Sequence, residues 1–268
     1  AWGVAANSGN ANACCPMSHE YAEEMARLAA RATGRAPADF VVASTGVIGQ
    51  TLNIAAIRAG MPEAAAGLTA GPEGSDAAAR AIMTTDTVKK ELALACSIGG
   101  RTVTLGAIAK GSGMIHPNMG TMLCFVTTDC AITREMLSEA LREVVPRTFN
   151  RVTVDGDTST NDMCAVLANG MAGNPLIEWK DDGYTVFLKA LRQLCQELAR
   201  AIAGDGEGAS RLITCAVREA RSEESAERLA KAVVGRFNAL SLWRGSLQAR
   251  EGANKQVISS QADSLIKI

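Results

Sequence analysis

Two patterned segments joined by a pair of glycines constrain the fold of this chain more than any other feature. Between residues 91 and 98, the apolar residues Leu92, Leu94, Cys96 and Ile98 alternate with other residues, which is the period of a strand with one covered face. Gly99-Gly100 follows and is a hairpin turn signal, so residues 101–109 are predicted to return as a second strand. The sequence therefore predicts a β-hairpin that leads directly to Lys110.

The stretch after the hairpin, residues 110–129, reads KGSGMIHPNMGTMLCFVTTD. It begins with a lysine and a glycine-rich loop and ends in an apolar run. The run at residues 122–126 is short enough to predict a strand buried on both faces. Thr121 is then a hydroxyl at the junction of a loop and a rigid strand, a good support for a functional site.

The rest of the chain alternates between strand and helix patterns. Strands are predicted at residues 1–7, 40–43, 152–154, 163–168 and 211–217, with turns at 8–15 and 44–46. Helices are predicted at 18–33, 51–58, 62–68, 76–83, 133–145, 182–203 and 222–235. The first helix has Ser18 as its expected cap and Gly34 as its stop, and Thr133 is expected to cap the helix that follows it.

Composition excludes several function classes. A net charge of −1 argues against nucleic-acid or membrane-surface binding by bulk electrostatics. No apolar run reaches the length of a spanning helix and the start has no basic leader region, so we expect a cytoplasmic protein. The eight cysteines contain no C-x-x-C pair and are expected to be reduced and mostly buried, and with only two histidines no metal site is expected.

Six blocks of sequence resemble the ornithine acetyltransferase family, the bifunctional glutamate N-acetyltransferases of arginine biosynthesis. They are NSGNANAC, ASTGVIG, AIMTTDT, KGSGMIHPNMGTML, FNRVTVDGDTSTND and GDGEGAS, in the family's order from Asn7 to about Val234. The resemblance implies a mixed α/β fold, a sandwich of mixed β-sheets flanked by helices that resembles the ornithine acetyltransferase/DmpA-like fold. It also implies an α-chain-like segment 1–120, a β-chain-like segment 121–235, and a tail, 236–268, unlike the family.

The resemblance also implies roles for particular residues. The family cuts itself before a threonine, which places the cleavage site at Gly120–Thr121 and makes Thr121 the nucleophile. It assigns the oxyanion hole to Thr45 and Gly46, and substrate binding to Thr87, Lys110, Thr121 and Glu207. The implied reaction moves acetyl from N-acetylornithine to glutamate without a cofactor, with acetyl-CoA as an open alternative donor. The implied assembly is a heterotetramer built from two copies of each cleavage product.

The chemistry of Thr121 is consistent with that role. A threonine hydroxyl needs a neighbouring base, and cleavage before Thr121 would create an α-amino group with a pKa of about 7.7–8 on the same residue. One cut would thus provide both nucleophile and base, and the backbone freedom of Gly120 would ease the attack.

Other interpretations remain. The same chemistry would suit an amidohydrolase if water replaced the acceptor amine. Because the family's first and last segments have no counterpart here, a non-catalytic truncated remnant is the alternative from a different class. The residues 111–116 imitate the start of a dinucleotide loop and residues 155–166 imitate a calcium loop, but each lacks an essential residue of its motif.

Overall fold

A computed structural model describes residues 1–115, 122–234 and 255–259. Its strands form a four-stranded sheet in the order β3-β4-β5-β7, a two-stranded sheet β1-β2, and a three-stranded sheet β6-β9-β8. The strands are β1 (Gly3–Asn10), β2 (Phe40–Val47), β3 (Lys90–Ile98), β4 (Arg101–Lys110), β5 (Leu123–Thr128), β6 (Val152–Thr153), β7 (Met163–Ala168), β8 (Ala209–Thr214) and β9 (Lys255–Ser259). The helices are α1 (Ser18–Thr33), α2 (Ile54–Ala66), α3 (Pro72–Ala81), α4 (Arg134–Val144) and α5 (Asp182–Gly204), and residues 223–234 are also helical.

The predicted hairpin is confirmed. β3 and β4 pair antiparallel from Ile98 opposite Arg101 to Lys90 opposite Ala109, across the Gly99-Gly100 turn. β5 then lies between β4, which it meets antiparallel, and β7, which it meets parallel. The chain therefore leaves the sheet after Lys110 and re-enters it at Leu123, which is the register partner of Lys110.

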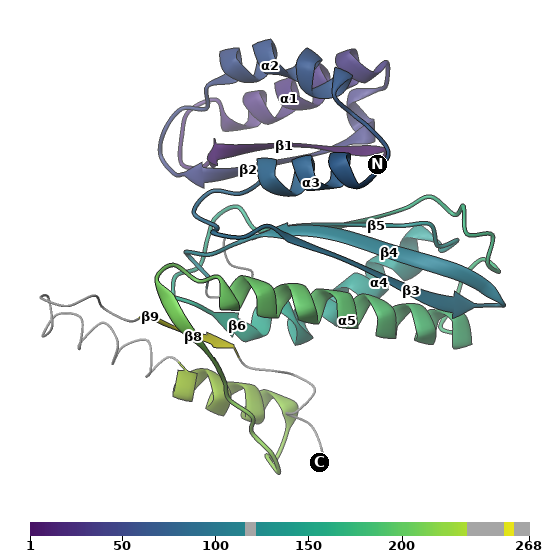
Figure 1. The fold of residues 1–268 in the computed structure, drawn as a ribbon, viewed down its shortest axis with the longest axis vertical. Coiled ribbons are helices and arrows are strands. Elements are labelled where there is room, and N and C mark those ends of the chain that lie inside the picture. The colour runs from purple at the N-terminus through teal and green to yellow at the C-terminus, as the bar shows by residue number, and fades with distance from the viewer. Residues whose placement is uncertain (116–121, 235–254, 260–268) are drawn as a thin grey trace, which may run out of the picture.

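The elements are arranged as layers on the two faces of the four-stranded sheet (Figure 1). Helix α5 lies along one face with α4 beside it, and α3 and the β1-β2 pair lie on the opposite side, with α1 and α2 outermost. This arrangement confirms the predicted mixed α/β fold of sheets flanked by helices.

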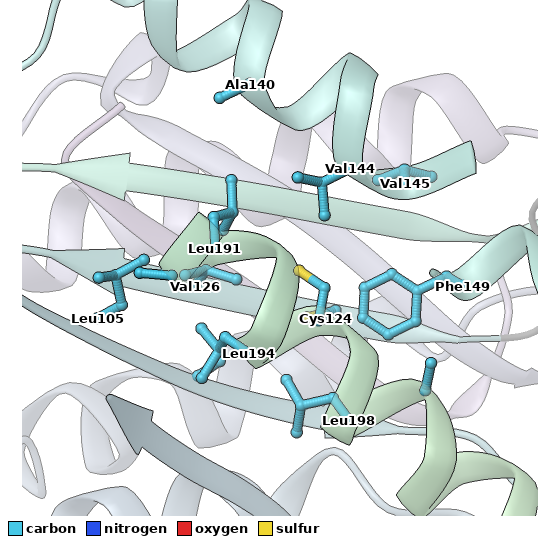
Figure 2. Close-up of a cluster of buried hydrophobic side chains, with 14 of the residues drawn as sticks. Leu105, Cys124, Val126, Ala140, Val144, Val145, Phe149, Leu191, Leu194 and Leu198 are labelled. Carbon is cyan, nitrogen blue, oxygen red and sulfur yellow. The ribbon is translucent and has the colours of Figure 1, made fainter. Parts of the chain in front are cut away.

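The main core fills the space between the sheet, α4 and α5 (Figure 2). Leu105 of β4 and Cys124 and Val126 of β5 point toward Leu191 and Leu194 of α5. A smaller core on the other face joins Leu123 and Phe125 to Ala43 of β2 and to Ile82. Alternate residues of β5 thus enter different cores, and the prediction of a strand buried on both faces is confirmed.

Two helix predictions agree closely with the structure. Thr133 is the N-cap of α4, where its hydroxyl accepts a hydrogen bond from the Met136 N–H. Gly34 ends α1 in a left-handed conformation (φ 68°) that glycine adopts without steric strain. In the part of the chain that the structure describes, no helix has the length and hydropathy needed to cross a membrane.

Several local predictions in the first seventy residues are wrong. Met17, not Ser18, occupies the N-cap of α1, and it makes no side-chain hydrogen bond there. The region 51–68 forms one helix, α2, because contacts with α1 and an alanine-rich sequence outweigh the helix-breaking tendency of Gly60 and Pro62. Residues 8–10 continue β1 rather than forming a turn, since they pair with β2.

Candidate active site

Lys110 is the last residue of β4 and lies at the end of the sheet nearest the glycine-rich loop. Strand alternation places its side chain on the same face as Ile108, toward the β1-β2 layer. The side chain is fully buried, and Nζ donates to Thr84 Oγ1 at 2.7 Å and to Thr45 Oγ1 at 3.4 Å. Burial lowers the pKa of Lys110, while the nearby Asp86 carboxylate opposes that shift. Two residues singled out from sequence, Lys110 and Thr45, therefore meet.

Thr45 and Gly46 are within β2, not in a turn after it, so that local prediction is wrong. Ser8 and Gly9 of β1 pair with them in parallel register and keep the chain extended. Gly46 has φ 130°, and a Cβ added there would lie 2.2 Å from the carbonyl carbon of Gly9. Only glycine permits this close approach of the two strands, and this is how Thr45 is held beneath Lys110.

A buried ionic network lies beside Lys110. Lys90 of β3 donates to Asp86 Oδ1 at 2.7 Å and to Asp205 Oδ2 at 2.6 Å, and all three side chains are almost completely buried. Asp86 also accepts from the backbone N–H of Gly111 at 2.7 Å, and its Oδ2 lies 3.9 Å from Lys110 Nζ. Burial by itself raises the pKa of Asp86, but the bonds from Lys90 and Gly111 outweigh it and hold the pKa below its usual range. Asp86 therefore holds the start of the glycine-rich loop in place and partly compensates the positive charge of Lys110.

Thr87 belongs to the same network. Its backbone N–H donates to Asp205, and its hydroxyl also donates to an oxygen of that carboxylate. The hydroxyl oxygen keeps lone pairs for another donor. The substrate-binding role expected for Thr87 stays a prediction, and its visible contact ties the residues before β3 to the end of α5.

Glu207 follows α5 and lies against the glycine-rich loop. Its N–H donates to the carbonyl of Ser112 at 2.8 Å. A Cβ added at Gly113 would lie 2.5 Å from the Glu207 carboxylate, so the missing side chain makes room for it. The negative charge of Glu207 also acts on the pKa of Lys110, which shows that the two lie in the same neighbourhood.

Gly120 and Thr121, the predicted cleavage site, lie outside the described residues. The chain on their C-terminal side is fixed by Asp162, whose Oδ1 accepts from the Met122 N–H at 2.8 Å. Met122 directly follows the predicted nucleophile in the sequence. It lies at the same sheet end as Lys110, because the next residue, Leu123, pairs with Lys110. The site residues expected from sequence therefore gather around this end wherever the structure describes them.

Sequence reasoning did not find Asp86, Lys90, Asp162, Asp205 or Thr84. Asp86 and Lys90 are four residues apart in an irregular segment where that spacing has no structural meaning. Asp205 and Asp162 come from distant parts of the chain. The quoted family blocks contain Thr84, Asp86, Asp162 and Asp205, but no role was assigned to them, and Lys90 lies outside those blocks.

Among residues 1–115, 122–234 and 255–259, no group of three or more His, Cys, Asp or Glu side chains is placed to hold a metal ion. A separate cavity of about 290 Å³ lies between β1, α1 and α2, and its lining, which includes Met25, Phe40 and Leu68, is mostly apolar. None of the polar residues around Lys110 lines it.

Comparison with known proteins agrees with this picture. The ArgJ family profile matches residues 1–240, and the chain therefore belongs to the ArgJ family. It is 56% identical over 233 residues to the arginine biosynthesis bifunctional protein ArgJ of Symbiobacterium thermophilum, covering 87% of this chain and 58% of that protein. The corresponding proteins of Geobacillus kaustophilus and Bacillus subtilis are each 47% identical, covering 87% of this chain and 56% of theirs. The chain thus spans little more than half the length of these relatives, and the resemblance to the ornithine acetyltransferase family is confirmed.

Two solved structures are also similar. The arginine biosynthesis bifunctional protein ArgJ of Bacillus halodurans has a TM-score of 0.40 and 40% identity, covering 45% of this chain and 61% of that chain. An ornithine acetyltransferase of Mycobacterium tuberculosis, complexed with ornithine, has a TM-score of 0.37 and 34% identity, covering 42% of this chain and 61% of that chain.

Proposed function

We propose that this chain carries the acyl-transfer site of a self-processing N-acetyltransferase that moves acetyl from N-acetylornithine to glutamate in arginine biosynthesis. The observation that carries the proposal is the contact of Lys110 with Thr45 at the sheet end where the chain re-enters at Met122, with Glu207 bonded to Ser112 of the adjoining loop. Family membership supports the same reaction.

The first half-reaction begins with cleavage of the Gly120–Thr121 bond, which frees the α-amino group of Thr121. The hydroxyl of Thr121 then attacks the acetyl carbonyl of N-acetylornithine, and the amino group takes its proton. The oxyanion is met by the Thr45 hydroxyl and the Gly46 N–H. The C–N bond breaks, the proton passes to the departing amine, and ornithine leaves acetyl-Thr121.

The second half-reaction reverses these steps with glutamate. Its α-amine attacks the acetyl ester, and Thr121 is regenerated as N-acetylglutamate departs. Lys110 binds the α-carboxylate of each amino acid, since it is a buried cation whose ion pair within the described residues, with Asp86 Oδ2, is as long as 3.9 Å. Glu207 attracts the substrate's positive group, and the lone pairs of Thr87 Oγ1 accept a further hydrogen bond. No cofactor takes part, because the donor supplies its own acyl group.

The proposal includes the rest of the protein's setting. The two cleavage products stay together and assemble as a heterotetramer with two copies of each, and the protein works in the cytoplasm. Acetyl-CoA as a donor, and water as an acceptor in an amidohydrolase, are alternatives that the same site chemistry allows.

Intact-mass spectrometry tests the proposal. We expect the chain to appear as two pieces, residues 1–120 and 121–268, and the second piece to gain one acetyl group after incubation with N-acetylornithine. Thr121→Ala should abolish both cutting and transfer, a loss of roughly 10⁴-fold or more. Thr127→Ala is the matched control, because Thr127 is an exposed threonine on β5. A single uncut, inactive species at every age would instead favour a non-catalytic member of the family.

A further inference from the structure

Thr45 has a buried hydroxyl whose donor side is unused. Its exposed fraction is 1%, and its Oγ1 accepts a hydrogen bond from Lys110 Nζ at 3.4 Å. A threonine hydroxyl donates one hydrogen and accepts through two lone pairs. Among the residues that the structure describes, no acceptor takes the hydrogen of Thr45. That hydrogen is therefore available to a bound molecule.

The charge of Lys110 decides the direction of the bond between the two side chains. A protonated lysine has three N–H donors and no lone pair, so it can only donate. Thr45 must then accept, and its own hydrogen has to point away from Lys110. A neutral lysine has a lone pair and could accept the Thr45 hydrogen instead, which would turn the donor of Thr45 back toward Lys110.

The other contacts of Lys110 hold its ammonium group in place. Nζ donates to Thr84 Oγ1 at 2.7 Å, and the N–H of Thr84 donates in turn to Asp86 Oδ2 at 3.1 Å. Asp86 Oδ2 lies 3.9 Å from Nζ, which is too long for a hydrogen bond but close enough for electrostatic attraction. Two threonines thus occupy two of the three N–H groups, which leaves the third for a substrate carboxylate.

Charged groups from several segments act on the protonation of Lys110. Burial lowers the pKa of Lys110 below its ordinary value, while three carboxyl groups raise it and one cation lowers it further. These are Asp86 before β3, Asp162 before β7, Glu207 after α5, and Lys90 of β3. The contacts with Thr45 and Thr84 add no charge. The neutral form of Lys110 is therefore reached at a lower pH than for an exposed lysine.

We propose that Lys110 is a positioning residue for the oxyanion hole: its ammonium group occupies the lone-pair side of the Thr45 hydroxyl and directs the O–H toward the acyl oxygen of the substrate. This inference rests on the proposed function and adds to the carboxylate binding given to Lys110 there. When the acyl carbonyl is attacked, its oxygen gains the negative charge, and the oriented Thr45 O–H donates to it. Lys110 gives up no proton in this step, and its bond to Thr45 polarises the hydroxyl into a stronger donor.

The test is a double-mutant cycle of Lys110→Met and Thr45→Val, measured with two acetyl donors. One donor is N-acetylornithine, and the other is N-acetylputrescine, which is the same molecule without its carboxylate. Lys89→Met is the matched control, because Lys89 forms its ion pairs at the surface. The control should leave kcat unchanged with both donors.

We expect Lys110→Met to lower kcat by about tenfold or more with either donor, and to raise KM for N-acetylornithine as well. Thr45→Val should lower kcat by about 10²-fold. In the Thr45→Val background, Lys110→Met should lower kcat for N-acetylputrescine by less than about twofold, because no hydroxyl is left to orient.

Three outcomes would overturn the inference and leave the proposed function standing. The first is an equal effect of Lys110→Met with and without the Thr45 hydroxyl, and the second is a loss of kcat confined to N-acetylornithine. The third is a wild-type chain that uses N-acetylornithine but not N-acetylputrescine, since Lys110 would then act only through the carboxylate. A wild-type chain that transfers acetyl from neither donor would overturn the proposed function together with the inference.

A second measurement needs only the wild-type chain and so applies even if Lys110→Met does not fold. The ¹³Cε signal of Lys110 is titrated, and kcat/KM for N-acetylputrescine is measured over the same pH range. Activity should fall as pH rises through the pKa of Lys110, because a neutral lysine no longer fixes the direction of the Thr45 hydroxyl. A titration of Lys110 without a matching fall in kcat/KM would overturn the inference.

Discussion

The body of the four-stranded sheet and its end at Lys110 are both buried, but the body is packed with apolar side chains and the end with charged ones. Under α5, the sheet meets hydrocarbon side chains such as Phe187, Leu191 and Leu194, each with no exposed surface. At the end, Lys90, Lys110 and Asp86 are also buried, with exposed fractions of 2%, 2% and 8%, but they are charged. The comparison teaches that this protein isolates a polar cluster from water by means of the same sheet that forms its core.

The two regions also respond differently to the loss of one member. In the hydrocarbon region each contact is small and non-directional, so a deletion leaves a cavity whose effect grows with its size. In the ionic region each charge is acceptable only because its partner is present, so a deletion leaves a buried charge without compensation. Three variants separate these behaviours, and their stabilities are best measured in a Thr121→Ala background, in which the proposed cleavage before residue 121 should not occur.

The largest effect is expected from Phe187→Ala in α5. The side chain is completely buried in the main core, so its removal should lower the free energy of unfolding by about 4 kcal/mol at every pH. Urea unfolding measures the change. Trp179→Ala is the control, since Trp179 is 63% exposed and should change stability by less than about 0.5 kcal/mol. Equal effects for the two aromatic residues would contradict the core described here.

The next effect is expected from Lys90→Met, which removes the cation between Asp86 and Asp205. We expect a loss of about 3 kcal/mol at pH 7, because two buried carboxylates lose their partner. Both carboxyl groups have pKa values below 3.8 in the folded protein, although burial alone would raise them. The stability that these groups contribute is present above pH 3.8 and is lost as pH falls through their folded pKa values.

The difference between Lys90→Met and the parent should therefore narrow below about pH 4. The neighbouring Lys89 is the control, because it forms ion pairs with Asp76 and Glu91 at the surface. Lys89→Met should leave the unfolding curve unchanged. A pH-independent loss for Lys90→Met would mean that packing, not charge pairing, is its contribution.

The smallest effect is expected from Asp162→Asn, which should raise the free energy of unfolding, whereas the two preceding variants lower it. Burial raises the pKa of Asp162 from 3.8 to about 7, so the folded protein binds a proton that the unfolded chain has already lost between these values. Stability should fall as pH rises through that window. Asp162→Asn removes the effect and should stabilise the fold by about 1 kcal/mol at pH 8, after allowance for solvent screening. The gain should disappear near pH 4, and urea unfolding at pH 4, 6 and 8 measures it.

Much of the fold was predictable because its signals are local. The hairpin follows from alternation around Gly99-Gly100, and α4 follows from a capping threonine before an amphipathic run. The errors arose where tertiary contacts determine where a helix or strand begins and ends. α2 continues through Pro62 because it packs on α1, and β1 extends to Asn10 because β2 pairs with it.

The candidate site was predictable only in part, for a related reason. Motif resemblance identified Lys110, Thr45 and Glu207. The structure joins Lys110 to Thr45 and ties Glu207 to the adjoining loop through Ser112. No role was assigned from sequence to the members of the ionic network beside Lys110, because a charged residue in the sequence gives no sign of being buried. Asp205 and Lys90 are 115 positions apart and meet only after the sheet and α5 have formed.

The central position of β5 has a consequence for how a cut chain would behave. A break before Thr121 would assign β4 to one piece and β5 to the other, yet the ladder from Leu105–Thr128 to Lys110–Leu123 would still join them inside the sheet. The pieces could separate only by unzipping that ladder and exposing the core. Renaturation of the cut protein would then be a second-order association, faster at higher concentration, whereas the uncut chain would refold at a rate independent of dilution.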